Sequence, residues 1–327
     1  MIFKMEISRI DLNKPERVSN TIIIDLFTKN YQRLNTEFFE FQFDWLNRAY
    51  AAFKDFDKYM ILAFLFRKTF FSYSELFKVI TFEQFFSNRA LEVEKFNIIE
   101  ISKELKLSKE TARRKVIEME DAGIIKKNKK IIWLNFDAFN IQRPDDSIKS
   151  FSRLLASMSE FLYQNKITKK KYEKHHYEKG IKSRFTQVWG IFLDYQINYI
   201  VQRSNLLNND VIMFHIFGSL VYNQNLFMKK NGKSNHYRDE WWHDITHMGD
   251  KKGISAMTIS DLTGIPRPTV IRKLKVLMNE KNVIKDKNNL YSFKDGPLMK
   301  KFNEIRMQNV EKLSSTIASF NNIVIDN

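Results

Sequence analysis

The 327-residue chain contains no cysteine, which excludes disulfide bonds and zinc sites built from thiolates. The absence of cysteine is typical of proteins in a reducing compartment, so we expect a cytoplasmic protein. Glycine and proline are also scarce, with 9 and 5 residues. A nucleotide-binding loop needs clustered glycines to bring backbone amides close to a phosphate, and the chain has no such cluster.

Long hydrophobic runs are absent as well. The longest uninterrupted apolar run, residues 60–66, is far shorter than the roughly 20 residues of a membrane-spanning helix. The opening stretch MIFKMEISRIDLNKPERV has no apolar core of the kind found in signal peptides. The sequence also has no recognisable nucleophile–base pair and no paired carboxylates. We therefore expect neither membrane contact, nor enzymatic activity, nor a bound cofactor.

Two similar segments, which we call the first and second cassettes, lie 158 residues apart. The first, ISKELKLSKETARRKVIEMEDAGIIKK, starts at Ile101, and the second, ISDLTGIPRPTVIRKLKVLMNEKNVIK, starts at Ile259. Each predicts a helix-turn-helix, a motif whose second helix enters the major groove of DNA. We place the motifs at residues 98–123 and 256–281.

In the first cassette, Lys106 occupies the tight turn, where glycine is common, and Ser108 is a suitable N-cap for the second helix. Helical spacing predicts that Ala112, Val116 and Met119 face inward. Glycine at position 123 suits the left-handed conformation that ends many helices. The residues left facing outward are Lys109, Glu110, Arg113 and Arg114.

The second cassette has Gly264 in the turn and Pro266 at the start of its second helix, where the missing N–H of proline is no loss. Ile259, Leu262 and Ile265 are expected to supply apolar contacts. A buried stripe is predicted from the spacing of Val270, Leu274 and Leu277. The outward face is then formed by Arg267, Thr269, Ile271, Arg272 and Lys275.

Each cassette continues into two short apolar runs around a polar tip, which predicts a β-hairpin. The first hairpin spans about residues 124–135 and the second about residues 283–293. The first tip carries Lys126, Lys127, Lys129 and Lys130, and the second carries Lys285 and Lys287.

Both cassettes with their hairpins resemble the winged-helix DNA-binding domain of bacterial transcription regulators. The phrases LSKETARRKVIEMEDAGII and TGIPRPTVIRKLKVLMNEKNVI carry the resemblance, over about 40 residues in each half. Amphipathic helices are predicted before and after each cassette, an arrangement similar to the MarR family, whose terminal helices form the dimer interface. The resemblance implies a mostly α fold with small β-wings, in which two tandem winged-helix domains form an intramolecular pseudo-dimer.

The chain therefore divides into two related units of about 150 residues. We predict a first domain at residues 1–165, a basic linker at 166–184 and a second domain at 185–327. Because the apolar stripes of the flanking helices would cover one another within one chain, we expect a monomer with internal pseudo-two-fold symmetry.

The charge distribution favours an anionic partner. The net charge is +16, and residues 95–135 carry 11 basic against 6 acidic side chains, while residues 251–291 carry 9 against 3. A basic excess on both cassettes is expected where a protein contacts DNA phosphates. We therefore predict a double-stranded DNA-binding transcription regulator, in which the outward residues of both cassettes, including Ser108, and the hairpin lysines contact DNA. A replication initiator with tandem winged helices and a winged-helix interaction scaffold remain open alternatives.

Three further features suggest other roles. The basic run 166–184 is either a solvated linker or helix face, or an additional contact to the DNA backbone. The histidines His236, His243 and His247 include an i, i+4 pair and are weak candidates for a metal site, although ordinary surface histidines explain them more simply. Finally, the 29 phenylalanines mostly fill cores, and the resemblance implies that some of them line a pocket for a small-molecule effector.

Overall fold

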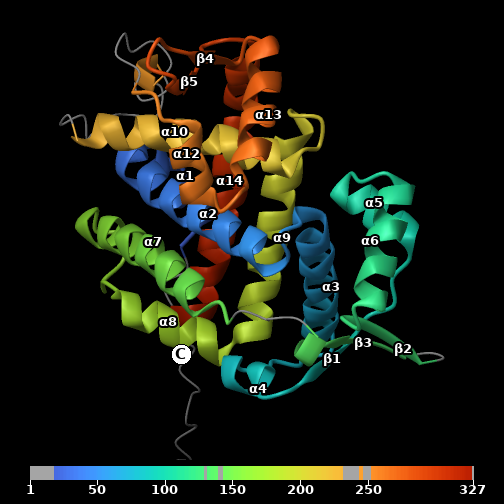
Figure 1. Ribbon diagram of the computed structural model, residues 1–327. Coiled ribbons are helices and arrows are strands. Elements are labelled where there is room, and N and C mark those ends of the chain that lie inside the picture. Colours follow the sequence, from blue (N-terminus) through green and yellow to red (C-terminus); the bar gives the residue numbers. More distant parts are fainter. Residues whose placement is uncertain (1–17, 129–130, 139–142, 231–242, 246–251, 326–327) are drawn as a thin grey trace, which may run out of the picture.

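The computed structural model describes residues 18–128, 131–138, 143–230, 243–245 and 252–325. The chain is mostly helical with two small antiparallel sheets, as the sequence predicts (Figure 1). Within the described residues, no helix combines the length and the apolar character that crossing a membrane requires.

The first half of the molecule runs from α1 to α7. Three helices, a short helix and a strand precede the first cassette, which is formed by α5 and α6. A hairpin and a 3₁₀ turn then lead to the last helix of this half. The elements are α1 (Asn20–Lys29), α2 (Tyr31–Phe53), α3 (Phe56–Glu75), α4 (Phe82–Phe86), β1 (Ala90–Val93), α5 (Ile98–Leu105), α6 (Lys109–Asp121), β2 (Ile125–Asn128), β3 (Ile131–Asn135), η1 (Phe136–Ala138) and α7 (Asp145–Gln164).

The second half repeats this succession. The helices α8, α9 and α10 precede the second cassette, which is formed by α12 and α13, and a hairpin leads to a long final helix. The elements are α8 (Lys174–Ser183), α9 (Phe185–Asn205), α10 (Val211–Lys230), α12 (Ala256–Thr263), α13 (Arg267–Asn279), β4 (Val283–Lys285), β5 (Tyr291–Phe293) and α14 (Pro297–Ile325). An isolated bridge between Ile254 and Tyr291 takes the place of the strand β1.

Helices of one half pack against helices of the other in matching pairs. The first helix of each half lies against the last helix of the other, α1 on α14 and α8 on α7. Likewise α3 packs on α9 and α10 packs on α2, and in Figure 1 these helices form the centre of the molecule. Helices of both halves therefore cover α7 and α14: α8 and α2 pack on α7, and α1, α9 and α8 pack on α14.

Capping residues determine where several of these helices begin. Asp55, immediately before α3, accepts hydrogen bonds from the backbone N–H groups of Asp57 and Lys58, at 3.0 and 3.3 Å. Asp210, immediately before α10, accepts one from Met213 at 2.8 Å. Such bonds satisfy N–H groups that the first turn of a helix cannot pair internally. The two equivalent helices thus begin with the same type of cap.

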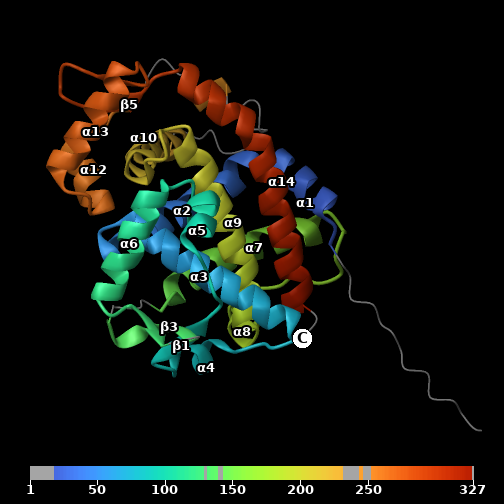
Figure 2. The same ribbon diagram turned by 90° about the vertical axis from the view of Figure 1, so that its right-hand side faces the viewer.

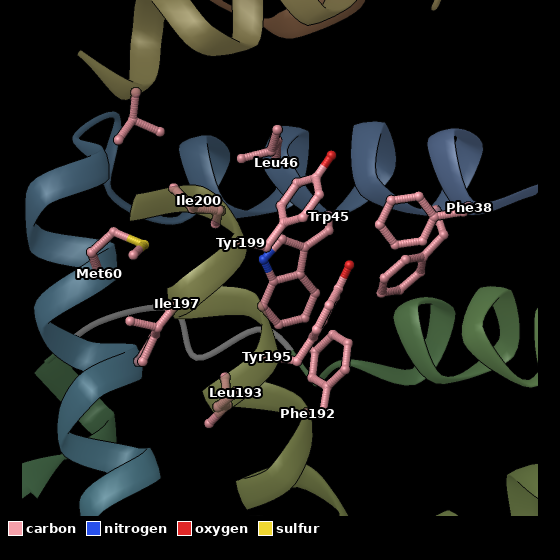
Figure 3. Close-up of a cluster of buried hydrophobic side chains, with 14 of the residues drawn as sticks. Phe38, Trp45, Leu46, Met60, Phe192, Leu193, Tyr195, Ile197, Tyr199 and Ile200 are labelled. Atoms are coloured by element: carbon pink, nitrogen blue, oxygen red, sulfur yellow. The ribbon is translucent and has the colours of Figure 1, made fainter. Parts of the chain in front are cut away.

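Aromatic side chains fill the region where α2 crosses α9 (Figure 3). The Trp45 ring lies 4.9 Å from that of Phe192, and Phe38 lies 5.5 Å from Tyr199, both with edge-to-face geometry. Rings at these angles gain from the quadrupole in addition to the apolar area that they bury. The core is therefore continuous across the two halves.

Two sequence-based expectations need correction. Residues 166–184 are not simply a linker, because Lys174–Ser183 form α8, in which Tyr177 and Ile181 are buried. Lys174, Lys179 and Lys182 of this run lie on α8, whose apolar side packs on α7 and α14, whereas Lys166, Lys169, Lys170 and Lys171 precede the helix. Leu262 was expected to be buried but is 44% exposed, and Thr263 takes the inner position instead, where its hydroxyl donates to the Ile259 carbonyl at 2.7 Å.

Candidate nucleic-acid interface

The two cassettes have the same internal geometry. Ser102 in α5 donates a hydrogen bond to the Leu107 carbonyl across the turn, and Ser260 in α12 donates to the Ile265 carbonyl, each at 2.7 Å. The turn residues Lys106 and Gly264 both have left-handed backbones, with φ of 55° and 68°. The turns are thus equivalent, although the residues differ.

The second helix of each cassette buries the predicted stripe. In α6, Ala112, Val116 and Met119 are at most 2% exposed, and in α13 Val270, Leu274 and Leu277 are fully buried. Their burial against α3 and α10 determines which face of each helix is directed outward. In Figure 2 both cassettes lie along the left-hand side of the molecule, with α13 above α6.

Most of the predicted contact residues lie on the outer face of α6. Ser108 is its N-cap, and its hydroxyl accepts a hydrogen bond from the Thr111 N–H at 3.0 Å. Arg113 is exposed and has no ion pair with any described residue. Arg114 is also exposed but pairs with Glu118 at 3.3 Å, so it is partly neutralised within the helix. Lys109 and Glu110 are exposed in the first turn.

The outer face of α13 carries fewer acidic neighbours. Arg267, Arg272 and Lys275 are exposed, and Ile271 is 39% exposed. Thr269 was predicted to contact DNA, but it is half-buried in the first turn of α13. The cationic face of α13 is therefore free of the internal pairing that holds Arg114 on α6.

The hairpins that follow the cassettes are formed as predicted, in part with a different placement of the lysines. Lys126 and Lys127 lie in strand β2 and not at the tip, and Lys127 is paired with Glu120 of α6. Lys129 and Lys130 lie outside the described residues. In the second hairpin, Lys285 ends β4 with its ammonium 5.6 Å from the centre of the Tyr291 ring.

The tip of the second hairpin is organised by one carboxylate. Asp286 accepts hydrogen bonds from the backbone N–H groups of Asn288 and Leu290, at 2.9 and 2.8 Å. Lys287 is exposed in the same turn. This tip therefore presents one lysine beside an acidic residue, whereas the strands of the first hairpin carry lysines alone.

Sequence analysis missed one lysine in each cassette that is directed inward. Lys115 and Lys273 are each the seventh residue of their helix, α6 and α13. Lys115 binds Asp55 at 2.7 Å, and Lys273 binds Asp210, so each lysine contacts the N-cap of the helix that supports its cassette. The signal was present as a lysine repeated at equivalent positions, but its acidic partner is distant in sequence.

The carboxylates around Lys115 favour the charged form of this lysine. Burial opposes the charged form of Lys115, but hydrogen bonds to Asp55 and Glu118 outweigh it and raise the pKa of the ammonium. Glu118 is in turn bound by Lys58, which with Lys115 lowers the pKa of its carboxyl group. The second pair, in contrast, has Asp210 as the only acidic partner of Lys273 among the described residues.

A groove of about 480 Å³ lies between the cassettes and is lined by both halves. Its walls include Arg114 and Lys115 of α6 and Lys273 of α13, with Lys54 at the corner before α3. Burial raises the pKa of Asp57 at the groove, and the neighbouring Asp55 charge adds to this effect. The groove places the inward faces of α6 and α13 on opposite sides of one depression.

The metal-site hypothesis gains no support. His243 is the one candidate histidine within the described residues, and its side chain is 70% exposed beside Asp244. His236 and His247 lie outside these residues. The part of the chain that the structure describes contains no group of three side chains able to hold a metal ion.

Comparison of the chain with family models, curated proteins and solved structures finds no match.

Proposed function

We propose that this protein binds double-stranded DNA and regulates transcription through two non-identical winged-helix modules joined in one chain. The observation that carries the proposal is the set of exposed basic residues on the second helix of both cassettes, α6 and α13. Figure 2 shows these two helices on the same side of the molecule. In a helix-turn-helix this helix is the one that enters the major groove. The hairpins would then contact the adjacent backbone as wings.

In this mechanism, the arginines provide the main polar contacts. Arg113 on α6 and Arg267 and Arg272 on α13 extend into solvent, and guanidinium groups bind guanine or phosphate bidentately. The inward pairs, Lys115 with Asp55 and Lys273 with Asp210, hold each helix against its supporting helix. Because the two helices carry different side chains, the preferred operator would be asymmetric.

The packing of the two halves supports a pseudo-dimer within one chain. The terminal helices α1 and α14, and α7 and α8, contact each other across the halves and cover the stripes that a separate subunit would otherwise cover. We therefore expect a monomer of 39.2 kDa in solution. A stable mass of twice this value in light scattering would contradict the pseudo-dimer.

The test is DNA binding by variants in each cassette. A preferred duplex is first selected from random DNA, and affinity is then measured by fluorescence anisotropy. The double variant Arg113→Ala/Arg114→Ala and the single variant Arg272→Ala should each weaken binding, by about 1–3 kcal/mol for each base contact that is lost. The exposed Lys149 on α7, replaced by alanine, serves as the control. Unchanged affinity in both cassette variants would refute this function.

A further inference from the structure

The molecule contains two cavities at equivalent places in the two halves. The first, of about 100 Å³, is bounded by α2, α3, the start of α7 and α9, and the second, of about 90 Å³, by α9, α10, α14 and α2. Counted from the start of each helix, Trp45 and Ala63 in the first cavity match Tyr199 and Gly218 in the second. In Figure 3, Trp45 and Leu193 belong to the first lining, and Phe38 and Tyr199 to the second.

The two cavities differ in how their cationic groups are balanced. In the first, Arg48 pairs with Asp44 at 2.9 Å and Asp146 at 3.3 Å. Arg143 there pairs with Glu83 at 2.9 Å. No carboxylate lines the second cavity among the described residues.

Two arginines line the second cavity: Arg306, whose guanidinium lies 5.8 Å from the centre of the Tyr31 ring, and Arg203, which has no counter-ion within the described residues. Arg203 is 8% exposed, its guanidinium lies 3.7 Å from the centre of the Tyr199 ring, and its Nη1 is buried without a hydrogen-bond partner. Asn35, which is 4% exposed, also has a buried Nδ2 without a partner in the same lining. At the equivalent positions the first cavity has Ala49 and Trp189, which carry neither a charge nor an amide group, and the unpartnered donor in its lining is the neutral Trp45 Nε1.

Buried donors without partners are rare, because each forfeits the hydrogen bonds that it made to water. Arg203 Nη1 and Asn35 Nδ2 are two such donors in one lining that has arginines and no carboxylate among the described residues, which favours an acceptor that carries negative charge. The lining also includes Asn309, whose amide oxygen accepts a hydrogen bond from the Tyr195 hydroxyl at 3.0 Å. Most of the other lining residues are aromatic or aliphatic, and Phe217 and Phe302 stack at 5.6 Å with an angle of 7° between their rings. An enclosed cavity of about 150 Å³ holds benzene, so the smaller volume here admits only a short apolar body.

We propose that the second cavity binds a small organic carboxylate, with its oxygens on Arg203 and Asn35 and a short aliphatic body among the aromatic side chains. The first cavity, in which the arginines are already paired, does not bind it. This site is independent of the DNA-binding proposal, and its test uses no DNA.

The experiment compares carboxylates with their uncharged amides on the full chain at constant ionic strength. Butyrate and isovalerate are each tested beside butyramide and isovaleramide by thermal unfolding and by calorimetric titration. At least one acid should raise the melting temperature by about 2 °C or more above its amide, as expected for a ligand in excess over its dissociation constant. If no acid exceeds its amide, the site does not exist.

Variants then locate the site. Arg203→Met should abolish the difference between acid and amide, and without ligand it should melt higher than the wild type, because an unbalanced buried charge has been removed. The matched variant Arg48→Met, in the first cavity, should leave the difference unchanged. Asn35→Leu provides a second test at the other donor and should weaken acid binding several-fold. An acid response that persists in Arg203→Met and Asn35→Leu would overturn the proposal.

Discussion

Each cassette has a positive φ at two positions, one in the turn and one after the second helix. Glycine occupies the position after the helix in the first cassette and the turn position in the second. In the first cassette, Lys106 has φ of 55° in the turn and Gly123 has 70° after the second helix. In the second cassette, Gly264 has 68° in the turn and Lys281 has 60° after the helix. A left-handed backbone costs a residue other than glycine about 1–2 kcal/mol. Each cassette therefore contains one lysine with a strained backbone, at a position where the other cassette has glycine.

The packing of a cassette, and not the type of its turn residues, therefore determines its backbone path. The buried stripes and the serine bonds across the turns are the same in both cassettes, and they hold the turn even where lysine opposes it. Differences between the halves are concentrated in polar and charged groups.

The largest effect concerns His215 in α10, which matches Met60 in α3. Its ring is fully buried and hydrogen-bonded to Asn47 at 2.8 Å, and burial lowers its pKa to about 3. The folded state therefore resists protonation while the unfolded state accepts a proton below about pH 6.5. Stability present above this pH is lost as the pH falls towards 3, by up to about 1.4 kcal/mol per pH unit.

The variant His215→Met introduces the residue found at the matching position of the first half, Met60. It should remove the part of the pH dependence of stability that comes from His215. The free energy of unfolding, measured by urea titration between pH 7 and 4, should fall less steeply than in the wild type. Replacing the exposed His175 by methionine is the control and should leave the slope unaltered. An equally steep slope in His215→Met would show that this histidine is not buried in its neutral form.

The second prediction tests how strongly each inward lysine depends on a single carboxylate. Asp210→Ser keeps a hydroxyl cap for α10 but leaves Lys273 without its carboxylate, and should destabilise the chain by about 2–3 kcal/mol. Asp55→Ser should have a smaller effect, because Lys115 retains Glu118 at 3.1 Å. Thermal and urea unfolding of both variants measure the difference. Equal losses would mean that Glu118 does not compensate.

The third prediction separates the two hairpins by their salt dependence, and it depends on the proposed DNA binding. Replacing Lys126, Lys127, Lys129 and Lys130 by alanine should flatten the slope of log affinity against log salt by about two to four units. Replacing Lys285 and Lys287 should flatten it less, since Asp286 lies between them. Anisotropy at several salt concentrations measures both slopes. An altered sequence preference in the first variant would contradict a purely backbone contact.

The smallest effect is at the turns. Lys106→Gly gives the first cassette the turn glycine of the second and should stabilise the chain by about 1 kcal/mol, because the left-handed backbone is no longer strained. Gly264→Lys should destabilise it by a similar amount. Differential scanning calorimetry measures both changes. A loss of stability in Lys106→Gly would show that the lysine side chain contributes more than its backbone strain removes.

Short-range patterns predicted the parts of the fold that depend on neighbours in sequence. Spacing identified the buried stripes of α6 and α13, and residue type identified the Ser108 cap. The inward lysines were missed because Asp55 and Asp210 lie more than 50 residues away, and only the packing of α3 and α10 brings them close. The resemblance implied a pocket lined by phenylalanines, but the positions of the cavities could not be predicted, because helices from both halves form their walls.

Because both halves belong to one polypeptide, a substitution alters only one of two equivalent positions. In a symmetric homodimer the same change would appear twice, and its effect on stability would be doubled. A buried guanidinium such as Arg203 can therefore arise in one half while Ala49 keeps the matching site of the other apolar. Joining the halves allows each equivalent pair of positions to evolve as two separate residues.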